Sequence, residues 1–76
     1  MAFAYVHRTK FGTFAITPYE GRWLVIYRND SLGSYHSPEA ALDDLVGGHT
    51  FTPSNGVDTS RVGLSDDLGE WERQPI

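Results

Sequence analysis

Alternating apolar and polar positions predict strands in the first half of the chain. Residues 12–18 place Phe14 and Ile16 on one face, and Pro18 ends the segment because it has no backbone N–H to donate. Residues 22–28 are apolar on both faces. One face carries Trp23, Val25 and Tyr27, and the other carries Leu24 and Ile26. Such a strand is normally central and covered on both sides.

A third, shorter strand is predicted over residues 32–36, after a tight turn at residues 29–31. Because the two apolar runs are separated by so few residues, they are expected to form a hairpin. Residues 3–8 are expected either to add another strand or to extend the first one.

The next segment has the signature of a helix with both ends defined. Ser37 is a favourable N-cap, Pro38 suits the first helical position, and Glu39 complements the positive end of the helix dipole. The apolar positions recur at helical spacing: Ala41, Leu42, Leu45 and Val46. Gly47 is expected to take the left-handed conformation that ends the helix.

Residues 47–76 show no sustained period and are expected to wrap as an irregular tail over the 1–46 core. Ser65 is positioned to cap one short helical turn through Leu68. The second apolar face of the central strand is either covered, for which the tail is the available element, or exposed as a patch and hence a binding site. The sequence does not decide which sheet face the tail covers. The apolar side chains that the tail offers are Phe51, Leu64, Leu68 and Trp71.

These elements predict a single α+β domain spanning residues 1–76. Its predicted architecture is a three-stranded antiparallel sheet with one packed helix, in the order β-β-β-α, followed by the irregular tail with its short turn. A chain of 76 residues allows one domain at most.

Composition favours a cytoplasmic protein. The chain has no cysteine, which excludes disulfides and thiolate metal sites and is typical of a reducing compartment. No apolar run is long enough to cross a bilayer, and residues 1–10 lack the features of a signal peptide, so no membrane association is expected.

Charge is distributed unevenly along the chain. Residues 1–36 contain four Lys or Arg and two carboxylates, whereas residues 37–76 contain two Arg and eight carboxylates. Such an asymmetry can steer a partner or self-association, but a solvated surface with chance asymmetry is the favoured interpretation.

Candidate chemistry is concentrated in the stretch GGHTFTPSNGVDTS, residues 47–60. His49 and Asp58 could activate the hydroxyl of Ser54 or Ser60. However, the chain has no nucleophile elbow and no second scaffold half that would form a substrate cleft. We therefore expect no enzyme activity.

A metal site could use His49 with a carboxylate such as Asp43, Asp44 or Asp58. No repeated ligand spacing supports it, so neither a metal nor another cofactor is expected. We interpret the stretch as an ordered connector. Because long ordered loops are often functional, His49, Asn55 and Asp58 remain candidates for a ligand-binding loop.

The segment GRWLVIYRNDSLGSYHSPEAALDDL, residues 21–45, resembles the core of AP2-type and phage-integrase arm-binding domains. The resemblance implies DNA binding through the sheet face opposite the helix. The cations available for it are Arg8, Lys10, Arg22 and Arg28. Leu24 and Ile26 would also lie on that face and cannot pair with base edges or phosphates. The chain is acidic overall, so nucleic-acid binding is the disfavoured alternative.

The run LGSYHSPEAA…GGHTF…NGVDTS is similar to that of a group of short uncharacterised bacterial proteins. This resemblance implies a bacterial cytoplasmic setting and no assigned activity.

The favoured function is a small non-enzymatic binding module that engages an unknown protein partner or a second copy of itself. An edge strand is available for pairing. Tyr27, Tyr35 and Trp71 are the candidate aromatic anchors, because aromatic side chains often dominate binding energies.

Overall fold

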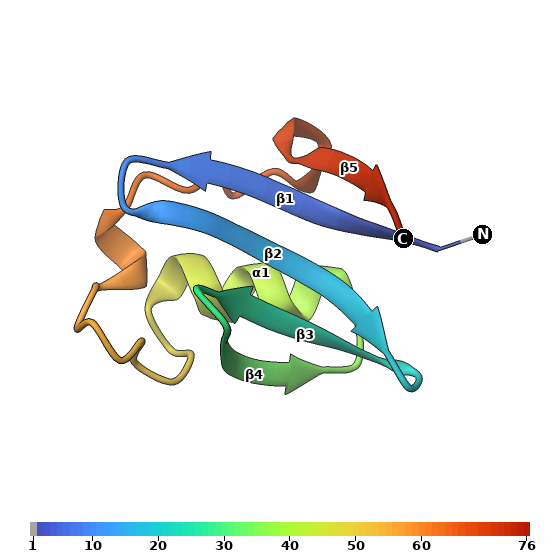
Figure 1. The fold of residues 1–76 in the computed structure, drawn as a ribbon, viewed down its shortest axis with the longest axis horizontal. Coiled ribbons are helices and arrows are strands. Elements are labelled where there is room, and N and C mark those ends of the chain that lie inside the picture. The colour runs from blue at the N-terminus through green and yellow to red at the C-terminus, as the bar shows by residue number, and fades with distance from the viewer. Residues whose placement is uncertain (1) are drawn as a thin grey trace.

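A five-stranded antiparallel sheet organises the fold in the computed structural model, which describes residues 2–76 (Figure 1). The strand order is β4-β3-β2-β1-β5, and a single α-helix lies behind the sheet in this view. The strands are β1 (Phe3–Thr9), β2 (Gly12–Tyr19), β3 (Arg22–Tyr27), β4 (Asp30–Tyr35) and β5 (Glu72–Pro75). The helices are α1 (Pro38–Gly47) and two 3-10 turns, η1 (Thr59–Arg61) and η2 (Leu68–Glu70).

The prediction of a three-stranded sheet is therefore wrong, although the protein is a small α+β fold. β1 is a separate strand that pairs with β2, and β5 pairs with the free edge of β1, where Val6 is opposite Glu72. β5 has the sequence ERQP and no apolar alternation, so the pattern gave no sign of it. Backbone pairing forms this strand, and Pro75 is tolerated because β5 is at the sheet edge.

The turn between β3 and β4 is also shorter than predicted. It consists of Arg28 and Asn29, both with positive φ (52° and 70°), rather than residues 29–31. Two consecutive residues of this conformation match the twist of a strand pair, and Asn accepts it more readily than most side chains.

The predicted start of α1 is confirmed. The Ser37 hydroxyl accepts a hydrogen bond from the Ala40 backbone N–H at 3.1 Å, and Pro38 is the first helical residue. The predicted end is displaced by one residue. Gly47 is still helical, and Gly48 takes the left-handed conformation (φ 75°).

The inner face of the sheet carries the core. The strand register places Phe14 opposite Tyr27 and Ile16 opposite Val25, and all four side chains are fully buried. The rings of Phe14 and Tyr27 stack with their centroids 4.2 Å apart. The helix closes this layer with its own apolar stripe of Ala41, Leu42 and Leu45.

The tail packs on this same inner face. Trp71 belongs to the core cluster, and its ring is 5.1 Å from that of His7, whose register partner is Phe14. The tail therefore covers the inner face of the sheet, a choice that the sequence left open. On the outer face, Leu24 and Ile26 lie outside the core cluster and are partly exposed.

Two details of the tail also differ from prediction. Phe51 does not dock, since 73% of its surface is exposed. The short turn η2 begins at Leu68 with Asp67 as its cap, two residues after the predicted Ser65 cap. Leu68 nevertheless packs against the core beside Trp71, as the spacing predicted.

Candidate functional site

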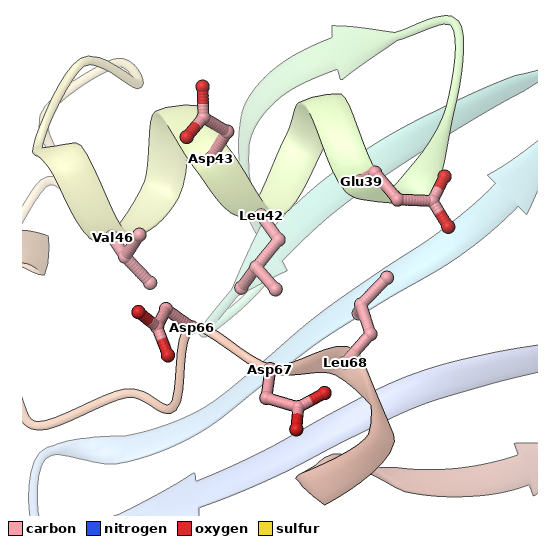
Figure 2. Close-up of a pocket in the computed structure, with 7 residues that line it drawn as sticks. All are labelled: Glu39, Leu42, Asp43, Val46, Asp66, Asp67 and Leu68. Carbon is pink, nitrogen blue, oxygen red and sulfur yellow. The ribbon is translucent and has the colours of Figure 1, made fainter.

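A groove separates α1 from the tail segment that leads into η2 (Figure 2). Its volume is about 490 Å³. Seven residues line it: Glu39, Leu42, Asp43, Val46, Asp66, Asp67 and Leu68. We call this feature the acidic groove, because four of these side chains are carboxylates and none is basic.

Helical spacing builds the first wall of the acidic groove. The α1 positions 39, 42, 43 and 46 recur at intervals of three and four residues, so they share one side of the helix. Leu42 also reaches the core and is only 5% exposed, which fixes this wall to the sheet.

Hydrogen bonds in the tail hold the second wall. The buried Trp71 donates from its indole nitrogen to the Ser65 carbonyl oxygen at 2.8 Å. The Ser65 hydroxyl in turn accepts from the Asp67 backbone N–H at 3.1 Å. One oxygen of Asp67 accepts from the Gly69 backbone N–H at 2.9 Å, which caps η2. The groove is therefore formed without a ligand.

The floor of the acidic groove is apolar. Figure 2 shows Leu42 and Val46 on α1 and Leu68 on the opposite wall projecting into the space between the two segments. All four carboxylate residues line the groove, Glu39 and Asp43 from the helix and Asp66 and Asp67 from the tail. Their charged groups do not converge on the floor, because Figure 2 shows the Asp43 carboxylate directed away from the tail and the Asp67 carboxylate directed away from α1.

No Lys or Arg of residues 2–76 forms an ion pair with these four carboxylates. The ion pairs in this part of the chain join Arg8 to Glu72 at 3.3 Å and Arg61 to Asp58 at 3.5 Å. Because α1 itself contains acidic but no basic side chains, the groove carries a local excess of negative charge.

A second hollow, of about 300 Å³, lies at the far end of the inner face. It is lined by Ala2, Phe3, Tyr5, Pro18 and Trp23. Its lining contains no charged side chain, although the Arg73 guanidinium lies over the Phe3 ring at 5.7 Å. This hollow therefore differs from the acidic groove in its chemistry.

The structure places two of the predicted aromatic anchors in the core. Tyr27 is fully buried, and its hydroxyl donates to the Phe11 carbonyl oxygen at 2.5 Å. Trp71 is 4% exposed. Neither side chain presents a contact surface to a partner. Tyr35 is half-buried; burial raises the pKa of its hydroxyl, and the neighbouring carboxylate of Asp44 raises it further.

The ligand-loop candidates make separate contacts. The Asn55 side-chain amide donates to the Tyr27 hydroxyl at 3.0 Å. Asp58 accepts from the Ser60 hydroxyl at 2.7 Å and from the Ser60 backbone N–H at 3.0 Å. These hydrogen bonds hold the pKa of Asp58 below its usual value. Asp58 lines a cavity of about 250 Å³ to which His49 and Asn55 do not contribute.

The possible catalytic and metal-binding arrangements are likewise not assembled. The Ser60 hydroxyl donates a hydrogen bond to Asp58 and makes none with His49, which is exposed. Within residues 2–76, no three His, Asp or Glu side chains are placed to hold a metal ion.

The cations of the nucleic-acid alternative contact groups of their own chain. Arg22 donates to the Ser34 hydroxyl at 2.6 Å and to the Ser34 carbonyl oxygen at 2.9 Å. Arg8 pairs with Glu72. Lys10 lies over the Phe11 ring at 5.4 Å, and Arg28 lies over the Tyr27 ring at 5.8 Å.

Comparison with known proteins gives no family assignment: no protein family, no curated protein and no solved structure matches this chain. Among residues 2–76, no helix has the length and apolar character needed to span a membrane.

The sequence analysis did not identify the acidic groove. The sequence did indicate the helical wall of the groove, because Glu39 and Asp43 are one turn apart beside the apolar stripe of α1. The signal for the other wall was only the excess of carboxylates after residue 37. Nothing in the sequence pattern indicated that Asp66 and Asp67 face the helix, because that depends on where Trp71 docks.

Proposed function

We propose that this protein is a small non-enzymatic binding module that engages a protein partner through the acidic groove. The observation that carries the proposal is that one groove combines an apolar floor with four carboxylates that form no ion pair with a Lys or Arg of residues 2–76. Apolar area supplies binding energy, and charge at the rim supplies specificity and faster association.

The dimensions support a peptide-like ligand. A volume of about 490 Å³ lies in the usual range for binding sites, and the groove is open along its length between two chain segments. Both walls are tied to the core, through Leu42 and Trp71, so binding would require little rearrangement.

Site-specific photocrosslinking in host cells tests this proposal. The crosslinking residue p-benzoylphenylalanine replaces Asp43, which is exposed at the groove, or Glu20, an exposed acid in the β2–β3 turn. The two variants lose the same charge, so they differ only in location. We expect a discrete protein adduct from position 43 and none from position 20.

A groove-floor variant serves as the second control. Leu68→Asn in the Asp43-substituted chain is expected to abolish the adduct while circular dichroism shows a folded protein. An adduct with twice the mass of the chain would identify the partner as a second copy. Equal adducts from both positions, or none from position 43, would contradict the proposal.

A further inference from the structure

The charge and apolar content of the acidic groove together define the chemistry of its ligand. Resting on the function proposed above, we infer that the segment entering the groove is basic and amphipathic, with apolar side chains flanked by Lys or Arg. The partner is therefore a protein with a cationic, leucine-like segment, rather than an acidic protein or a nucleic acid.

The positions of the carboxylates support the basic part of this inference. Glu39 and Asp43 are four residues apart on α1, which corresponds to about 6 Å along the helix axis. Asp66 and Asp67 occupy the opposite wall. A cation in the groove would be attracted by these charges, and physiological salt screens that attraction strongly only beyond the Debye length of about 8 Å.

No Lys or Arg of residues 2–76 lines the acidic groove or pairs with its carboxylates. Of the two Arg residues after position 37, Arg61 pairs with Asp58, and Arg73 lies over the Phe3 ring. Neither contributes to the lining of the groove. A phosphate-bearing or acidic ligand would therefore meet unopposed repulsion there.

The floor supports the apolar part of the inference. Leu42 is almost fully buried by the core, whereas Val46 and Leu68 are half-buried and keep part of their surface in the groove. A polyamine or an oligolysine segment would cover this surface poorly. A leucine-like side chain would remove this apolar surface from water, which favours binding.

Fluorescence anisotropy with three labelled peptides tests the inference. The first is an amphipathic peptide of Lys and Leu. The second replaces every Leu by Ala and keeps the charge, and the third replaces every Lys by Glu and keeps the apolar side chains. We expect the Lys–Leu peptide to bind, the Lys–Ala peptide to bind at least several-fold more weakly, and the Glu–Leu peptide not to bind.

Matched charge variants locate the binding. Asp43→Asn with Asp66→Asn removes one carboxylate from each wall of the groove, whereas Glu20→Gln with Glu72→Gln removes two exposed carboxylates elsewhere. The Asp43→Asn and Asp66→Asn variant is expected to bind the Lys–Leu peptide about tenfold more weakly, which corresponds to about 1.4 kcal/mol. The Glu20→Gln and Glu72→Gln control is expected to change the affinity less than twofold. Raising the salt concentration should weaken binding to the wild-type protein.

The outcomes separate this inference from the proposed function. Equal weakening by both pairs of substitutions would overturn the inference, and so would equal binding of the Lys–Leu and Lys–Ala peptides. If no peptide binds but position 43 still captures a protein, the proposed function stands and the inference is wrong. If position 43 captures nothing and no peptide binds, both are wrong.

Discussion

The acidic groove and the outer face of the sheet are both open surfaces with an apolar centre, but they differ in what their charges contact. On the outer face, Arg22 is hydrogen-bonded to Ser34 and Arg8 is paired with Glu72. In the groove, the carboxylates of both walls have no cationic partner among residues 2–76. A charge satisfied within the chain supports the local fold, whereas a charge without a partner attracts an external one.

The two surfaces also differ in what holds them in place. The outer face is formed by the paired strands of the sheet, with a register shift between Val25 and Ile26 in the pairing of β3 with β4. The second wall of the groove depends on the docking of Trp71, which connects η2 to β5. The groove can therefore be disrupted while the strand pairing of the outer face is kept.

The largest expected effect comes from removing the anchor of the groove. Trp71→Ala should destabilise the protein by about 3–5 kcal/mol, because a buried aromatic side chain leaves a cavity. Ile26→Ala on the half-exposed outer face should cost about 1 kcal/mol, since only part of its side chain is buried. Urea unfolding followed by circular dichroism measures both values.

If the Trp71→Ala variant does not fold, the milder Trp71→Phe variant still allows the free energy of unfolding to be measured. It retains an aromatic ring and removes the indole N–H that bonds to Ser65, so it should cost about 1–2 kcal/mol. Equal costs for the Trp71 and Ile26 alanine variants would show that the groove wall is not anchored as described.

A smaller effect is expected at the helical wall of the groove. Ser37→Ala removes the N-cap acceptor of the Ala40 N–H and should destabilise the protein by about 1 kcal/mol. Ser34→Ala, which removes the hydroxyl partner of Arg22 on the outer face, should cost less, because both groups are exposed. Thermal unfolding measures the stability that each variant loses. A larger loss of stability from Ser34→Ala than from Ser37→Ala would contradict this prediction.

The outer-face ion pair is expected to contribute little to stability. The side chains of Arg8 and Glu72 are 70% and 53% exposed, so Arg8→Ala should change the free energy of unfolding by about 0–1 kcal/mol. High salt should reduce even that difference. A loss that salt does not change would show that Arg8 stabilises the sheet through packing.

Two carboxylates, Asp58 and Asp30, should make stability depend weakly on acidic pH. Hydrogen bonds from Ser60 to Asp58, and from Ser54 to Asp30, hold the pKa of each carboxyl below its usual value. Their contribution is therefore present above the usual carboxyl pKa and is lost as pH falls through the lower, folded-state value. Asp58→Asn should flatten the acid limb of a stability–pH curve, and an unchanged limb would contradict this role.

The elements that could be predicted are those specified by residues close together in the sequence. Ser37 and Pro38 define the start of α1, and the alternation around Phe14 and Val25 defines two strands, since these signals lie within a few residues of each other. β5 could not be predicted, because ERQP carries no apolar period and its pairing with β1 joins opposite ends of the chain.

The acidic groove shows the same limit. Its helical wall follows from helical spacing, but the position of Asp66 and Asp67 depends on which sheet face the tail covers. Because β3 is apolar on both faces, its sequence suggested that other elements cover both of them. The outer face instead leaves Leu24 and Ile26 half-exposed, as antiparallel sheets with one solvated face often do.

The most direct test of the groove as the docking surface is an NMR titration of the ¹⁵N-labelled protein with the Lys–Leu peptide. If the peptide docks in the acidic groove, the amides of α1 and of residues 66–68 should shift saturably, with little change at Ala15, Leu24 and Ile26. Shifts confined to the outer face of β2 and β3 would contradict it, because they would place the binding surface on the other side of the sheet.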